Sequence, residues 1–163
     1  MAASSMFLPL TVDQAVQAFM KANLTGVNVG SIGELDTDEN GELVFDPPCA
    51  RTMYASTEFG EAADNLQLTY DDVAHTIDIW CADENLQTLE AQRQQSLAVV
   101  SQLLPVIAGA KISLNDDSTT EPVRLVRVES KLLQAQGGTP LRTVYIVTVL
   151  VPGIAQFPGV EGE

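Results

Sequence analysis

Apolar residues recur at helical spacing near the N-terminus. Val12 and Val16 fall on one stripe that continues to the end of the segment. Thr11 is placed to cap this helix, and Gln14 three residues later completes a capping box. The pattern predicts a helix over residues 12–23.

Strict alternation of apolar and polar residues predicts a strand over residues 73–81. One face of this strand carries Val73, His75, Ile77, Ile79 and Cys81. Shorter strands are expected near residues 27–32, where Gly30 and Gly33 permit a bulge or close backbone approach, and near residues 50–57.

Two further strands are expected near the C-terminus, at about 122–133 and 141–151. In the second strand both faces are apolar, which predicts an interior strand that is covered on both sides. In the first strand the apolar face changes between Leu125 and Val126, which predicts a β-bulge.

A long helix is expected from about 86 to 104, between the two groups of strands. Asp83 or Asn85 is placed to cap it, and Pro105 is expected to end or kink it. The element order predicts an α+β fold, with a mixed, mostly antiparallel sheet packed against an N-terminal helix and a long central helix. The 163 residues fit a single domain over 1–151 with a flexible or partner-bound tail over 152–163.

Charge is distributed unevenly along the chain. The net charge is −14, and residues 34–90 hold 15 acidic residues and one basic residue, Arg51. Residues 91–160 hold 4 acidic and 6 basic residues. This balance argues against a nucleic-acid-binding surface. It suits either head-to-tail association of an acidic side with a more basic side, or a solvated acidic face that aids solubility.

Residues 34–46, here called the acidic segment, contain Asn40-Gly41, a strong signal for a hairpin turn. The carboxylates of the acidic segment belong to Glu34, Asp36, Asp38, Glu39, Glu42 and Asp46. The first half of a calcium loop is reproduced by Asp36, Asp38, Asn40 and Glu42, but Pro47 occupies the position of the closing glutamate. The alternatives are an acidic hairpin turn and a weak Ca²⁺ or Mg²⁺ site; no other cofactor is expected.

Residue types that often act in catalysis or binding have ordinary structural explanations in this chain. His75 lacks a nucleophile partner in the sequence, which favours a packed imidazole. Cys49 and Cys81 are expected to be reduced thiols. Trp80 suits either an interface centre or the core beside the long helix. No enzyme motif and no membrane span is found in the sequence.

The element order also resembles a known family. The resemblance rests on Pro48-Cys49-Ala50 before a strand, on Ile77-Asp-Ile-Trp80 before a Gln-rich helix, and on the final hairpin. Over about residues 11–151 the chain is similar to the tail terminator and tail-completion proteins of long-tailed bacteriophages. This resemblance implies a sheet packed against helices and a hexameric ring that caps the tail tube and joins it to the DNA-filled head.

The resemblance implies particular partners: other copies of the chain, the tail tube protein and head-tail connector proteins. The location it implies is the virion tail, after assembly in the host cytoplasm. DNA would pass through without specific binding, and the acidic segment is hypothesised to line the channel. Candidate interface residues are Trp80, Arg124, Arg127, Lys131 and Arg142. The alternatives are another head-tail connector or neck protein, or a small acidic module that binds divalent metal.

Overall fold

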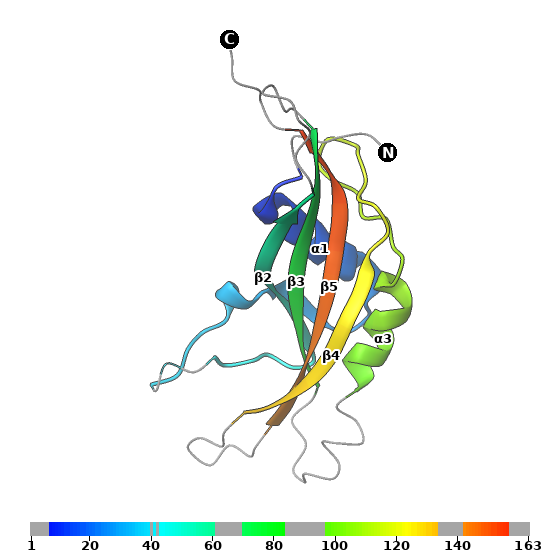
Figure 1. Ribbon diagram of the computed structural model, residues 1–163. Helices are drawn as coiled ribbons and strands as arrows, with labels where there is room; N and C mark the ends of the chain where they lie inside the picture. The colour runs from blue at the N-terminus through cyan, green and yellow to red at the C-terminus, as the bar shows by residue number, and fades with distance from the viewer. Residues whose placement is uncertain are drawn as a thin grey trace.

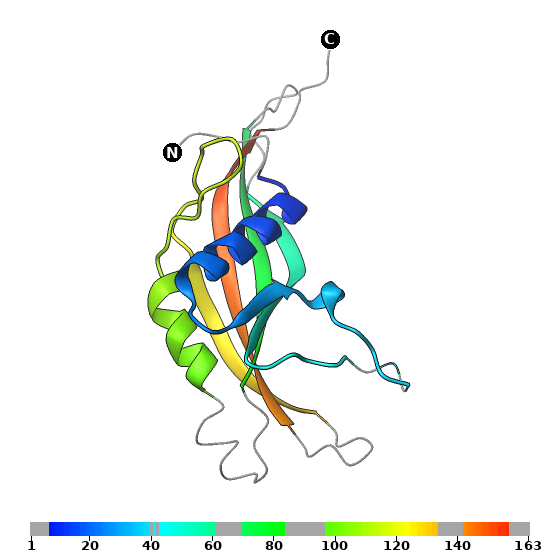
Figure 2. The same cartoon turned by 180° about the vertical axis from the view of Figure 1, so that it is seen from behind.

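Five strands form one sheet, and helices cover one of its faces (Figure 1; Figure 2). The structure is a computed structural model that describes residues 7–39, 41, 43–60, 70–83, 97–133 and 142–156. The strands are β1 (Asn28–Ser31), β2 (Cys49–Phe59), β3 (Tyr70–Ala82), β4 (Arg124–Leu133) and β5 (Arg142–Gln156). They lie in the order β1-β2-β3-β5-β4, with β1 parallel to β2 and every other pair antiparallel. The predicted α+β fold with a mixed, mostly antiparallel sheet is confirmed.

Helix α1 (Pro9–Asn23) begins earlier than the sequence suggested. Thr11 lies inside its first turn, and the residue at the cap is Leu8, which makes no side-chain capping bond. The predicted Thr11 cap is therefore wrong. A proline at the start of a helix gives up an N–H that would have no partner there, so Pro9 begins the helix at little cost. The apolar stripe is confirmed, because Val12 and Val16 are buried against the sheet.

The alternation in β3 divides the core between the two faces of the sheet. Ile77 and Ile79 lie in the larger cluster, together with residues of both helices. Trp80 points to the opposite face and belongs to a smaller cluster with Phe45 and Ile146. Interior strand β5 contributes to both clusters, as its two apolar faces predicted.

Helix α3 (Ala98–Ile107) packs beside β4 on the helix-covered face. Pro105 lies within α3 rather than after it, so the prediction that it ends the helix is wrong. Its ring is on the exposed side of the last turn, where the carbonyl that loses its partner can bind water.

The Oδ1 of Asp83 accepts a hydrogen bond from the Val99 N–H at 3.0 Å, so Asp83 caps the start of α3. Residues 84–96 lie outside the described part of the chain.

Helices within the described ranges are too short or too polar to span a membrane.

The bulge in β4 is confirmed, because the pairing with β5 shifts between Leu125 and Arg127. The end predicted for the last strand is wrong, since β5 continues past residue 151 to Gln156. Gly153 pairs with Val73 of β3, which begins at Tyr70 and is longer than expected. The longer β3 gives these residues a partner strand, so residues 152–156 belong to the sheet.

The acidic segment turns back on itself, as the hairpin prediction expected, but its described residues form no regular strand pair. It begins at the end of a short 3₁₀ helix, η1 (Ile32–Glu34), and its two sides meet at an isolated antiparallel bridge between Thr37 and Leu43. Leu35 and Phe45 pack onto the sheet at its two ends, whereas Leu43 and Val44 between them are exposed. Figure 1 shows this segment extending past the β1 and β2 side of the sheet, away from β4.

Candidate functional site

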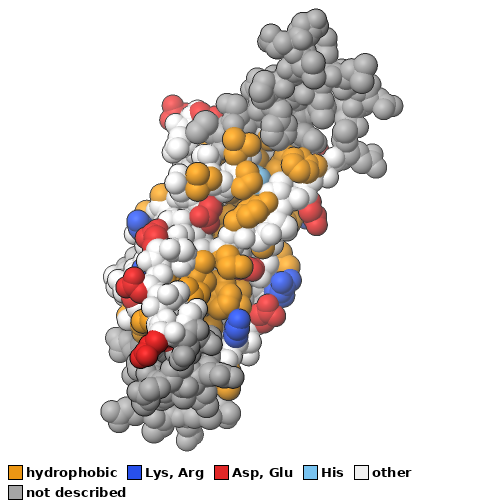
Figure 3. Space-filling view, turned by 90° about the vertical axis from the view of Figure 1, so that its left-hand side faces the viewer, with side chains coloured by type: hydrophobic (Ala, Val, Ile, Leu, Met, Phe, Trp, Pro, Cys, Tyr) orange, Lys and Arg blue, Asp and Glu red, His pale blue; other side chains and the backbone are white. Residues whose placement is uncertain are grey.

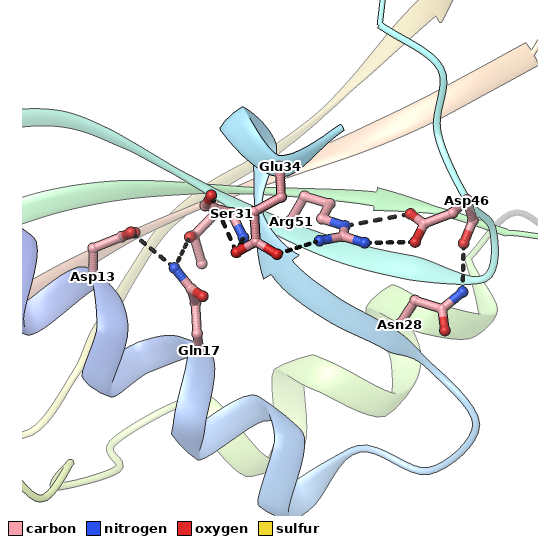
Figure 4. A network of polar contacts seen from close by, with 8 residues as sticks. Asp13, Gln17, Asn28, Ser31, Glu34, Asp46 and Arg51 are labelled. Atoms are coloured by element: carbon pink, nitrogen blue, oxygen red, sulfur yellow. Dashed lines mark hydrogen bonds and ion pairs between the residues drawn. The ribbon is translucent and has the colours of Figure 1, made fainter. Parts of the chain in front are cut away.

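Arg51 of β2 holds both ends of the acidic segment (Figure 4). Its guanidinium makes a two-pronged contact with the Asp46 carboxylate, with Nε to Oδ1 at 3.3 Å, and its Nη1 lies 3.5 Å from Oε2 of Glu34. The Arg51 side chain is buried, whereas both carboxylates are partly exposed. The one basic residue among residues 34–90 therefore anchors the acidic segment to the sheet.

Arg51 and Asp46 stabilise each other's charged forms. Burial disfavours the charged form of Asp46, but the hydrogen bond and the positive charge of Arg51 outweigh it and lower the pKa of that carboxyl. The hydrogen bonds that Arg51 donates to Asp46 in turn raise the pKa of Arg51. Both groups are therefore ionised at neutral pH, and the negative charges of Asp46 and Glu34 are partly balanced within the chain.

Neighbouring residues shape the space around Arg51. The side-chain Nδ2 of Asn28 donates to the Asp46 carbonyl at 2.7 Å, and the Ser31 N–H donates to Glu34 at 3.2 Å. A Cβ at Gly30 would collide with the guanidinium of Arg51. Of the two alternatives predicted for the glycines, a bulge is not found at Gly30, since its pairing with β2 is regular, and the group close to its backbone is the Arg51 side chain.

The remaining carboxylates lie further out along the acidic segment. Asp36 and Glu39 are exposed, and Asp38 is half-buried. The Gly41 N–H donates to the Asp38 carbonyl in a turn with a positive φ of 78° at Gly41. Two of the four residues considered as metal ligands, Asn40 and Glu42, lie outside the described residues. Within the described ranges no cluster of three or more His, Cys, Asp or Glu residues could hold a metal ion.

Basic candidates for the interface are arranged along β4, an outer strand of the sheet. Arg124, Arg127 and Lys131 are all exposed, and Nε of Arg127 lies 3.5 Å from Glu129 on the same strand. Arg142 begins β5, next to the end of β4, and its side chain is outside the described set. Acidic and basic candidates therefore lie at opposite edges of the sheet.

Trp80 is packed within its own chain. It is 9% exposed, its ring stacks on Phe45 at 6.1 Å between centroids, and Nζ of Lys131 lies 4.9 Å from its centroid. Trp80 is therefore a core residue, but it lies on the sheet face away from α3 and not beside that helix. Lys131 covers this ring while keeping its charge at the surface.

Hydrophobic side chains also gather along the outer side of β2 (Figure 3). β1 pairs with β2 only as far as Thr52. Beyond that point Met53, Tyr54 and Phe59 are 41%, 41% and 61% exposed. Sequence reasoning missed this patch, because the composition of a strand does not reveal which of its edges is covered.

The buried histidine and the two buried cysteines of the described residues lie in the packed core. His75 is buried and hydrogen-bonded through both ring nitrogens, to Thr57 and to the Phe7 carbonyl. The predicted packed imidazole is confirmed. Cys49 and Cys81 are free buried thiols that belong to different core clusters.

No protein-family model matches the sequence, and no curated protein matches it. Among solved structures, the chain is similar to a chain described as "Virion of native gene transfer agent (GTA) particle". The likeness covers 90% of this chain and 95% of that chain, with 14% sequence identity and a TM-score of 0.39. Similarity at this level carries no argument about function.

Proposed function

We propose that the chain is a virion structural protein of a phage-like tail. In this proposal it is a tail terminator, which assembles into a ring, caps the tail tube and joins it to the head. The sequence resemblance over residues 11–151 supports this role. The observation that carries the assembly proposal is the placement of an acidic segment and a basic strand at opposite edges of one sheet.

Opposite charges on opposite edges favour a head-to-tail contact. Such a contact uses two different surfaces, and repeating it about an axis closes a ring. A two-fold dimer through either edge would instead bring like charges together, which opposes association. The charge placement thus supports a closed ring over a symmetric dimer, and a hexamer is the order that the resemblance implies.

The net charge of −14 supports passage of DNA without binding, because the chain repels phosphate. The partners in this proposal are the tail tube protein and head-tail connector proteins. No catalytic role and no cofactor are proposed. Assembly would take place in the host cytoplasm, and the mature location would be the virion tail.

Light scattering coupled to size-exclusion chromatography, with negative-stain imaging of the same fractions, tests this function. The chain should be measured alone at high concentration and mixed with tail tubes isolated from the producing cells. We expect rings with a central hole, either free or at one end of the tubes. A single-chain mass under both conditions, with no chain bound to tubes, would contradict the proposal.

A further inference from the structure

We infer that neighbouring copies in the ring meet edge to edge: the outer side of β4 in one copy pairs with β2 from Met53 to Glu58 in the next. The acidic segment of the second copy then lies against the basic side chains on that β4. This inference rests on the proposed ring and specifies which surfaces close it.

The outer side of β2 has room for another strand. β1 flanks β2 over Cys49–Thr52, and the described residues include no strand beyond that point on this side. Met53 and Tyr54 each leave 41% of their surface exposed there. A strand edge that is open beside exposed apolar side chains is suited to pairing with another chain.

β4 presents the second open edge. It is the last strand in the order, and the described part of the chain places no strand on its outer side. Its exposed apolar residues are Leu125, Val126, Val128 and Leu132. The bulge at Val126 and the charges along β4 discourage indiscriminate pairing, so a specific partner edge is needed.

Strand directions agree with this contact. Each step from β2 through β3 and β5 to β4 is antiparallel, so β2 and β4 run in opposite directions within one copy. Rotation about an axis along the strands preserves these directions. β4 of one copy would therefore meet β2 of the next in an antiparallel pair, which continues the alternation of the sheet.

The basic residues of β4 also lie at the same height along the sheet as the open part of β2. The registers across the sheet place Arg124 in the same row as Ser56, and Arg127 in the same row as Met53. The basic half of β4 is thus level with the open part of β2. A ring can bring these two stretches together with little displacement along the strands.

Charge selects this pair of edges over the others. β4 carries Arg124, Arg127 and Lys131 against one acidic residue, Glu129. The β2 side carries exposed Glu58 and the exposed acids Asp36 and Glu39 of the acidic segment. Two β4 edges, or two β2 edges, would place like charges face to face. The β4 to β2 contact is the complementary one.

One consequence concerns the acidic segment. It leaves the sheet beside β1, on the side opposite β4, and extends outward from that edge (Figure 1). In an edge-to-edge ring that direction follows the circumference towards the next copy. The acidic segment would then bind the neighbouring subunit rather than line the channel.

Paired charge reversals test the contact in the full chain. One variant carries Arg124→Glu with Arg127→Glu, a second carries Asp36→Lys with Glu39→Lys, and a third combines all four substitutions. A control with Lys21→Glu changes the net charge in the same direction as the first variant, at an exposed position on α1. Assembly is measured by light scattering across a dilution series, and folding by thermal unfolding.

We expect each reversed edge to weaken assembly about tenfold or more, because like charges then face each other. The combined variant should recover most of this loss, and the control should assemble like the native chain. Two results would overturn the inference while leaving the ring intact: native-like assembly of either reversed variant, or loss in both without recovery in the combined one. Failure of the native chain to assemble would instead contradict the proposed function.

Discussion

The imidazole of His75 ties Phe7, two residues before α1, to the middle of the sheet, because its Nε2 lies 3.1 Å from the carbonyl oxygen of Phe7. A carbonyl only accepts, so Nε2 carries the proton. Nδ1 is then an acceptor, and the Thr57 hydroxyl donates a hydrogen bond to it at 2.9 Å. The neutral ring satisfies both contacts, and the aromatic ring of Phe7 packs on it with 4.8 Å between centroids.

This arrangement predicts a stability that depends on pH. Burial lowers the pKa of His75 below its ordinary value of 6.5. The unfolded chain therefore binds a proton more readily, and stability is lost as the pH falls from about 6.5 through the lower folded-state pKa. Urea unfolding of dilute protein at about pH 7.5 and about pH 5 should show this loss.

The control for this prediction is His75→Gln, which removes the only histidine of the chain. The variant should be less stable than the native chain at neutral pH, and its stability should change less between the two pH values. An equal change in both proteins would show that His75 is not the titrating group.

Gly153→Ala should destabilise the fold. A Cβ at Gly153 would lie 2.7 Å from Cζ and 2.8 Å from Cε1 of the Phe7 ring, closer than side chains pack. Moving the buried ring should cost about 1–3 kcal/mol in the free energy of unfolding. The matched control is Gly33→Ala, whose Cβ would meet nothing closer than 3.8 Å. Equal unfolding free energies for the two variants would contradict the packing described for Phe7.

Arg51→Met should release the acidic segment from the sheet. The substitution keeps an apolar stem but removes the contacts to Asp46 and Glu34. We expect faster proteolysis between residues 34 and 46 and a loss of about 1 kcal/mol, since both carboxylates are partly hydrated. Lys21→Met, at an exposed position on α1, should leave both measurements unchanged. Unchanged proteolysis of the Arg51 variant would disprove the anchoring role.

Both thiols should be unreactive in the folded chain. Burial, followed by the negative charge of Asp46, raises the pKa of Cys49 to about 11. Burial raises the pKa of Cys81 as well. A thiol reagent near neutral pH should therefore modify neither residue in the native protein but both in urea. Rapid modification without denaturant would mean that the described packing around the thiols is wrong.

Local patterns predicted much of this fold. The alternation around Ile77 and Ile79 identified the strand and its buried face, and the change of face at Val126 identified the bulge. Both signals arise from the two-residue period of a strand, which a short stretch of sequence contains in full. Boundaries were less accurate. Pro9 suits the first turn of a helix, which is a local signal, whereas Gly153 resembles a loop residue until its partner strand is known.

The candidate site depended on contacts between distant segments. The acidic segment looked like a hairpin or a metal loop, yet Arg51 holds its two ends from another strand. The open edge beyond Thr52 follows from the short length of β1, which pairing with β2 reveals and composition does not. A lone arginine next to a run of acids was the available signal for the anchor.

Cryo-electron microscopy of the assembled chain would show which strand edges join neighbouring copies. We expect a ring in which β4 of each copy lies antiparallel to Met53–Glu58 of its neighbour, with the acidic segment running along the circumference. A ring whose sheets do not join through these edges, with Asp36 and Glu39 facing the channel, would contradict this arrangement.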